Sequence, residues 1–258
     1  MRKRCPFLIL SILIALACLP LAAAAGEFLY QYSTINALLA GLYDGQLTMK
    51  DLKSKGSLGL GTFNHLDGEM VVLDGQVYQV KADGKVAVAA DPVKTPFAVV
   101  TFFTPKQFIL VKKAGSIKEL GELLDAALAT RNLFYAVKIE GRFQKVTARS
   151  VPRQTRPYPP LVKAAEHEAV FPFDNVVGTI VGLRCPGYVQ GINVPGYHFH
   201  FLTRDRKAGG HVLDCAVENV TVQVDPSHRL ELVLPEDREF YWLDLDRATT
   251  QELEKVEK

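Results

Sequence analysis

The spacing of apolar and polar residues predicts many short strands grouped between a few helices. Residues 69–73 and 76–80 are strand-favouring runs joined by Asp74-Gly75, a dipeptide typical of a two-residue β-hairpin. Ser116 and Glu119 form a capping box that predicts a helix over 116–130. Apolar spacing predicts further helices, and β-branched and aromatic runs predict further strands. These are helices at 33–42 and 161–169, a charged helix or tail at 246–258, and strands at 86–89, 98–103, 133–140, 143–151, 176–185, 212–224 and 228–234, with a turn at Gly141.

This order of elements favours an α+β fold. The strands cluster between helices instead of alternating strictly with them, which is typical of mixed or antiparallel sheets. Residues 152–160 contain four prolines and are expected to form an extended connector. We therefore predict an N-terminal α+β domain over 26–160 and a C-terminal α+β domain over 161–258. The two domains have a broadly similar order of helices and strands, but their sequences show no residue-level repeat.

The N-terminal residues have the pattern of a secretory signal peptide. Arg2, Lys3 and Arg4 precede an apolar run over 7–19, which is followed by a proline and four alanines at 22–25. The apolar run is too short to favour a lasting transmembrane helix. We predict a signal peptide over 1–25, and hence an exported chain. A lipid-anchored form at Cys18 is the less favoured alternative, because the residues before Cys18 match a lipoprotein box poorly.

Composition and charge fit a globular exported chain. The 258 residues are 48% hydrophobic and 22% charged, enough for a substantial core. Removing the three positive residues of the signal segment changes the formal net charge from +2 to −1. Without a basic stripe, nucleic acid is a poor candidate partner. Cys185 and Cys215 remain in the exported chain, and the sequence leaves open whether they form a disulfide or two buried thiols.

The stretch GYHFHFLTRDRKAGGH, residues 196–211, carries the strongest chemical signal. His198 and His200 lie two residues apart in a strand-favouring run, so their side chains share one face. Ala208-Gly209-Gly210 is a turn signal, and a returning strand would bring His211 to the same place. Three imidazoles leave coordination positions open on a metal ion, which is typical of catalytic rather than structural sites.

Three other classes of metal protein are less consistent with this stretch. Cupin-like metal proteins also use a His-x-His pair, but usually with a glutamate four or five residues later, where this chain has Arg204 and Asp205. An exported zinc hydrolase would be expected to carry His-Glu-x-x-His, which is absent from the sequence. A structural metal module would be expected to offer four ligands, often cysteines.

Three segments together resemble the α-acetolactate decarboxylase family. They are GTFNHLDGEM at 61–70, TARSVPRQTRPYPPL at 147–161 and GYHFHFLTRDRKAGGHVLDC at 196–215. The resemblance runs from about Glu27 to the C-terminus. It implies a zinc-dependent enzyme that converts 2-acetolactate to acetoin and carbon dioxide. It also implies two similar mixed-sheet domains with flanking helices and the metal between them, and commonly a homodimer.

The resemblance also implies roles for single residues. His198, His200 and His211 match the zinc ligands, Arg149 matches the active-site arginine, and Thr62 matches a position that lines the substrate pocket. A divalent ion can stabilise the enediolate that remains when carbon dioxide leaves. A guanidinium can form two hydrogen bonds with the carboxylate that is lost as carbon dioxide.

Two glutamates complete the expected site. Glu69 matches an active-site glutamate near the metal, and Glu257 matches a glutamate that the C-terminal tail brings in. Without the resemblance, each would be interpreted as a solvated surface residue. Either carboxyl group can deliver a proton to one face of the enediolate. The sequence does not decide whether Arg149 or one of the glutamates is the proton donor.

Overall fold

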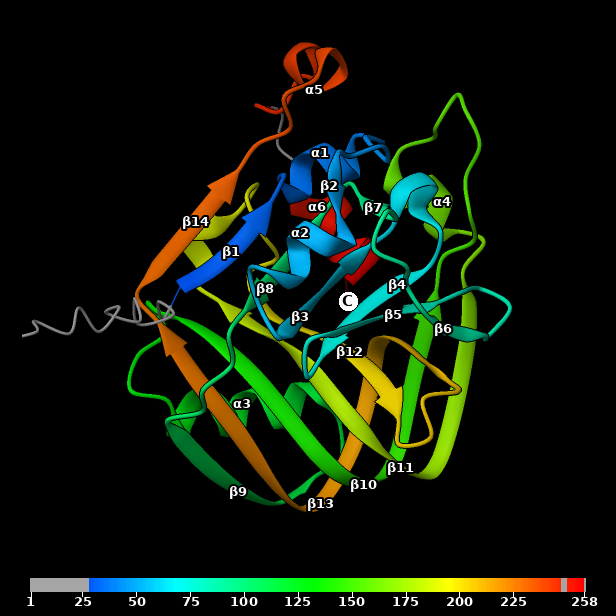
Figure 1. Ribbon diagram of the computed structural model, residues 1–258. Coiled ribbons are helices and arrows are strands. Elements are labelled where there is room, and N and C mark those ends of the chain that lie inside the picture. The colour runs from blue at the N-terminus through cyan, green and yellow to red at the C-terminus, as the bar shows by residue number, and fades with distance from the viewer. Residues whose placement is uncertain (1–27, 247–249, 258) are drawn as a thin grey trace, which may run out of the picture.

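The computed structural model describes residues 28–246 and 250–257, and two β-sheets make up most of it (Figure 1). The signal-peptide prediction lies outside the described residues. The larger sheet has seven strands, all antiparallel neighbours except the parallel pair β1 and β14. In spatial order these are β14 Arg229–Val233, β1 Phe28–Tyr32, β8 Ala98–Thr101, β3 Leu58–Thr62, β4 Glu69–Leu73, β5 Gln76–Val80 and β6 Val86–Val88.

The second sheet has five long antiparallel strands and closes on itself. Its order is β10 Phe134–Ser150, β11 Ala169–Cys185, β12 Gly196–Thr203, β13 Gly209–Ser227 and β9 Gln107–Ala114. Strand β10 also pairs with β13, so strands β10 to β13 form a closed ring of pairings. A small third sheet pairs β2 Leu47–Thr48 with β7 Lys94–Thr95.

The helices are short, and α3 lies against the five-stranded sheet (Figure 1). They are α1 Ile35–Leu39, α2 Met49–Lys53, α3 Ile117–Ala127, α4 Leu161–Ala165, α5 Arg238–Trp242 and α6 Thr250–Glu257, with 3₁₀ turns at Asn64–Leu66 and Gly187–Val189. In the described residues, no helix is long and apolar enough to cross a membrane. The α+β fold class is confirmed.

Two local predictions are confirmed in detail. Strands β4 and β5 form the predicted hairpin, and Asp74 and Gly75 at its turn have φ values of 52° and 78°. Helix α3 begins after Ser116, whose hydroxyl accepts from the backbone N–H of Glu119. The Glu119 carboxylate reaches back to accept from the backbone N–H of Gly115, the residue before the N-cap, so both side chains of the predicted capping box hold the start of the helix.

The predicted turn at Gly141 is wrong. Strand β10 continues from Phe134 to Ser150 through this glycine, which pairs with Gly178 of β11. The register with β13 shifts between Ile139 and Phe143, which marks a β-bulge. Continuous pairing with β11 keeps the strand extended through Gly141, where the local sequence alone favours a turn.

The sheets do not divide at residue 160. Strands β9 and β10 precede this position but lie in the five-stranded sheet with β11, β12 and β13. Strand β14 follows it but pairs with β1 in the seven-stranded sheet. The predicted connector therefore does not separate the two sheets, because long-range pairing rather than chain order decides which sheet a strand joins.

The main hydrophobic core lies between the two sheets. It includes Leu58 and Val71 from the seven-stranded sheet, Val181 and Leu202 from the five-stranded sheet, and Val256 of α6. A second core packs α3 against the five-stranded sheet, and a third lies on the other face of the seven-stranded sheet. The C-terminal helix is thus part of the packed interior, although its sequence is highly charged.

The two remaining cysteines are buried free thiols. Cys185 belongs to the core between the sheets, whereas Cys215 belongs to the core beneath α3. Burial raises the pKa of each thiol to about 12. Of the two alternatives that the sequence left open, the structure has the free thiols.

Candidate metal centre and active site

The three histidines meet on neighbouring strands. His198 and His200 project from β12 to the same side, and His211 on β13 is the register partner of His200. Nε2 of His198 lies 3.2 Å from Nε2 of His200 and 3.1 Å from Nδ1 of His211. The predicted hairpin return of His211 is confirmed.

The glycines of this hairpin have a different role from the predicted one. The turn lies at residues 204–207, and Gly209 and Gly210 already belong to strand β13. A β-carbon at Gly210 would lie 2.4 Å from the carbonyl oxygen of Arg149, and one at Gly209 would lie 2.2 Å from that of Phe201. The glycine pair therefore lets β13 approach both β10 and β12 closely, just before His211.

The three ring nitrogens fit a metal ion. Zinc–imidazole bonds of about 2.0–2.1 Å in a tetrahedron place two ligand nitrogens about 3.3 Å apart. The observed separations of 3.1–3.2 Å are close to this value. Nδ1 of His200 lies 2.7 Å from the carbonyl oxygen of Met70. Because that oxygen can only accept, Nδ1 carries the proton and the lone pair of Nε2 is free for a metal.

Burial keeps these rings neutral. It lowers the pKa of His198 to about 3, with the positive charge of Arg149 acting in the same direction. Burial also lowers the pKa of His200 and that of His211 well below the usual range. Three neutral nitrogens converge at one point inside the protein, and neutral imidazole is the form that binds a metal ion.

Two carboxyl groups from distant parts of the chain flank this cluster. Glu69, at the start of β4, places Oε2 at 3.8 Å from Nε2 of His200. Glu257, at the end of α6, places Oε2 at 3.4 Å from Nε2 of His198. The side chains of Glu69 and Glu257 are only 10% and 6% exposed. Both side chains are therefore buried, although the local sequence around each is typical of an exposed surface residue.

Both carboxyl groups have a raised pKa. Burial raises the pKa of Glu69 to about 7, against the lowering effect of Arg149. Burial raises the pKa of Glu257 to about 7 as well, again opposed by Arg149. A divalent cation at the histidines would lower both pKa values. Groups that titrate near neutral pH are suited to take up and release protons.

Arg149 lies at the centre of the cluster. It projects from β10 as the register partner of His211, and its side chain is 4% exposed. Nη2 donates to the backbone carbonyl oxygen of Val256 over 2.7 Å, and Nη1 donates to Oε2 of Glu168 over 3.1 Å. Within the described residues, the buried Nε has no hydrogen-bond partner.

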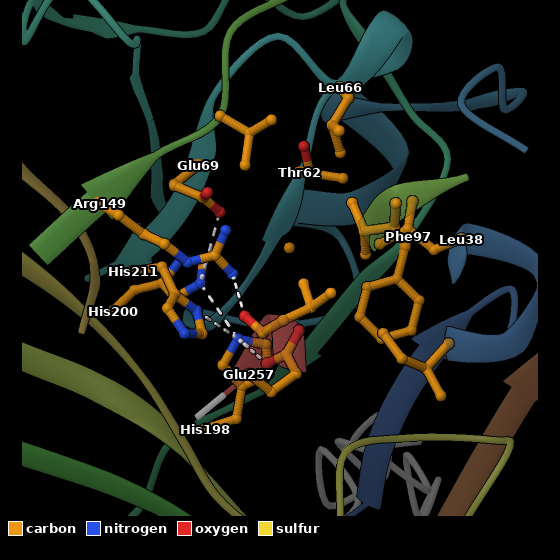
Figure 2. A pocket seen from close by; sticks show the side chains of 15 residues that line it. Leu38, Thr62, Leu66, Glu69, Phe97, Arg149, His198, His200, His211 and Glu257 are labelled. Atoms are coloured by element: carbon orange, nitrogen blue, oxygen red, sulfur yellow. Dashed lines mark hydrogen bonds and ion pairs between the residues drawn. The ribbon is translucent and has the colours of Figure 1, made fainter. Parts of the chain in front are cut away.

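These residues line one small cavity. Figure 2 shows Arg149, Glu69 and the histidines on one side of the pocket, with Phe97 and Leu38 across from them. The apolar side also includes Ile35, Leu66, Val151, Leu161 and Val256. The cavity of about 30 Å³ has room for about two water molecules.

Thr62 lies on this pocket as the sequence analysis expected. It is the register partner of Glu69 on the neighbouring strand, so the two side chains share a face. Its hydroxyl donates to the carbonyl oxygen of Gly68 over 2.7 Å, which leaves the oxygen available only as an acceptor. All seven candidate residues therefore line one cavity. Glu168 and the carbonyl oxygens of Met70 and Val256 were not predicted, and no local sequence signal indicates them.

The fold and the pocket define an α+β protein with a buried three-histidine cluster that could hold a metal ion beside an arginine and two carboxyl groups. Residues 29–247 match the alpha-acetolactate decarboxylase family. The chain belongs to this family, and it is a decarboxylase. Glu257 lies beyond the matched range, and the structure places it at the pocket, where the resemblance of the C-terminal residues led us to expect it.

Named relatives agree along most of the chain. The alpha-acetolactate decarboxylase of Methanosarcina mazei is 48% identical over 234 residues, which are 91% of this chain and 81% of that protein. That of Brevibacillus brevis is 43% identical over 91% of this chain and 82% of its own length. The crystal structure of the Bacillus subtilis alpha-acetolactate decarboxylase superposes with a TM-score of 0.87 at 39% identity, covering 89% of this chain and 99% of that one.

Proposed function

We propose that this protein converts 2-acetolactate to acetoin and carbon dioxide in a zinc-dependent reaction. The observation that carries the proposal is the set of three buried imidazole nitrogens 3.1–3.2 Å apart, with Arg149 and two carboxyl groups around them. The names of its relatives supply the substrate class. Zinc is the favoured metal because the 3.1–3.2 Å separations of the imidazole nitrogens fit its tetrahedral geometry, and three such ligands leave a coordination position open for a substrate oxygen.

The metal ion held by His198, His200 and His211 would supply Lewis acidity toward the hydroxyl and ketone oxygens of the substrate. Arg149 binds the carboxylate of the substrate and holds it in the cavity, with N–H groups that the protein leaves unused. The apolar residues across the pocket accept the methyl groups and exclude water, which strengthens each electrostatic interaction inside.

The protein must then place a proton on one face of the enediolate. Glu69 and Glu257 approach the cluster from different elements, β4 and α6, with carboxylate oxygens 3.8 Å from His200 and 3.4 Å from His198. Protonation from one side gives acetoin of one handedness. Arg149 remains the third candidate for the donor.

The resemblance also supports proposals about domain arrangement, export and oligomeric state. The resemblance implies two similar halves with the metal between them; the bond from His200, in the five-stranded sheet, to the backbone of Met70 in the other sheet supports a site between the sheets. The residues of the signal segment support export, with a lipid-anchored form as the less favoured alternative. The resemblance implies a homodimer, which light scattering of the purified chain would test.

The direct experiment measures acetoin and metal on the purified chain. The expected result is acetoin formation from 2-acetolactate, loss of activity with a chelator and recovery with added zinc. His228, an exposed histidine outside the pocket, supplies the matched control. His228→Ala should keep full zinc and activity, whereas His200→Ala should lose both. A chelated, metal-free enzyme with full turnover would contradict the proposal.

A further inference from the structure

Arg149 is held by an acidic residue that the proposed reaction does not use. Glu168 lies between α4 and β11, where Val170 is the register partner of Arg149. Its Oε2 accepts from Nη1 of Arg149 over 3.1 Å. The Glu168 side chain is 26% exposed, whereas the Arg149 side chain is 4% exposed. The pair therefore runs from the solvent side toward the cavity.

The two protein contacts of Arg149 fix the plane of its guanidinium. Glu168 binds Nη1, and the carbonyl oxygen of Val256 binds Nη2. These acceptors come from elements far apart in the sequence. A planar guanidinium held at two nitrogens cannot rotate about its side-chain bonds without breaking one of the bonds. Its other N–H donors, including the buried Nε, then have one orientation in the cavity.

We propose that Glu168 is a positioning residue for Arg149. The inference rests on the proposed role of Arg149 in binding the substrate. Glu168 does not line the cavity, so it acts through the guanidinium and not on the substrate. It also offsets the positive charge of Arg149 next to the metal cluster. Without it, the guanidinium would be held only by a backbone carbonyl of α6.

A bond of this kind affects turnover more than folding. Catalysis is sensitive to misplacement, since a shift of about 1 Å can cost on the order of a hundredfold in rate. Because the Arg149 end of the pair is buried, losing Glu168 also has some cost in stability. Loss of Glu168 should nevertheless lower turnover much more than it lowers zinc content or thermal stability. A pair with only a structural role would show the opposite pattern.

The neighbouring Glu166 offers a matched control. It precedes Glu168 by two residues, is exposed, and forms an ion pair of 2.7 Å with Lys163. We expect Glu168→Ala to lower kcat/KM about tenfold to a hundredfold. Glu168→Gln, which keeps an acceptor for Nη1 but not the charge, should retain more activity. Glu166→Ala should behave as the unmodified enzyme in every assay.

The decisive measurement is a double-mutant cycle between Glu168→Ala and Arg149→Lys. If Glu168 acts only through Arg149, adding Glu168→Ala to Arg149→Lys should cost little further activity. Full additivity would overturn the inference, and so would unchanged kcat and KM in Glu168→Ala. Loss of zinc or of thermal stability in parallel with activity in Glu168→Gln would overturn it too. Normal turnover in Arg149→Lys would instead contradict the proposed function.

Discussion

Removing the end of helix α6 should impair turnover much more than folding. The perturbation deletes residues 253–258, and with them three features at or next to the pocket. These are the Glu257 carboxyl group 3.4 Å from His198, the Val256 carbonyl that binds Arg149, and the buried Leu253 and Val256 side chains. The first two belong to the site, and the third anchors the helix.

The effect on stability follows from opposing contributions of similar size. Burying Leu253 and Val256 contributes about 3–6 kcal/mol in total. The bond from Arg149 to the Val256 carbonyl contributes about 1.5–3 kcal/mol, as hydrogen bonds of charged groups do. Fixing the backbone of residues 253–257 costs about 5–10 kcal/mol in conformational entropy. The net change in the free energy of unfolding is therefore small, and the shortened chain should still fold and bind zinc.

The effect on turnover should be large. Losing one acid–base group costs at least about tenfold. Glu257→Gln should reproduce most of this loss, because it removes the carboxylate but keeps the helix. The deletion should cost more than Glu257→Gln, since it also frees Nη2 of Arg149. The assay compares acetoin formation, zinc content and thermal unfolding of the two variants with those of the unmodified enzyme.

The exposed Glu254 provides the control for this experiment, because Glu254→Gln changes a carboxyl group of the same helix outside the metal cluster. It should leave turnover unchanged. The reasoning would be refuted if the shortened chain formed acetoin at the normal rate and with unchanged handedness. Glu257 would then have no part in the reaction.

Four further outcomes are expected. Replacing His198 with alanine should lower zinc content and abolish decarboxylation, and full metal occupancy in that variant, measured by elemental analysis, would exclude it as a ligand. Arg149→Lys should lose most activity while keeping zinc, because an ammonium group cannot reproduce a planar two-point contact; near-normal turnover would contradict this. N-terminal sequencing of the exported protein should begin near Gly26, whereas a soluble product that retains the initiator methionine would refute export. Because burial raises the pKa of Cys185 and Cys215 to about 12, both thiols should resist a thiol reagent at pH 8 in the folded protein. Both should react once the protein is unfolded in urea. Reaction before unfolding would show that the thiols are accessible.

Local sequence signals predicted the elements that depend on neighbouring residues. The Asp74-Gly75 hairpin and the start of α3 after Ser116 are examples, because turn and capping residues act within a few positions of themselves. The prediction failed at Gly141, where pairing with β11 keeps β10 extended. The sequence also predicted that the glycines before His211 form the turn. In the structure they lie in β13 and let neighbouring strands approach closely.

The sequence by itself determined the three-histidine cluster, because its members lie within 14 residues and strand alternation puts them on one face. The resemblance to a family added Thr62, Glu69, Arg149 and Glu257, which spacing alone would have left on the surface. Only the tertiary structure decided how these groups are held. The Met70 carbonyl fixes the tautomer of His200, while Glu168 and the Val256 carbonyl orient Arg149. Burial, pKa and orientation depend on residues far apart in the chain, and contacts of that kind leave no local pattern in a single sequence.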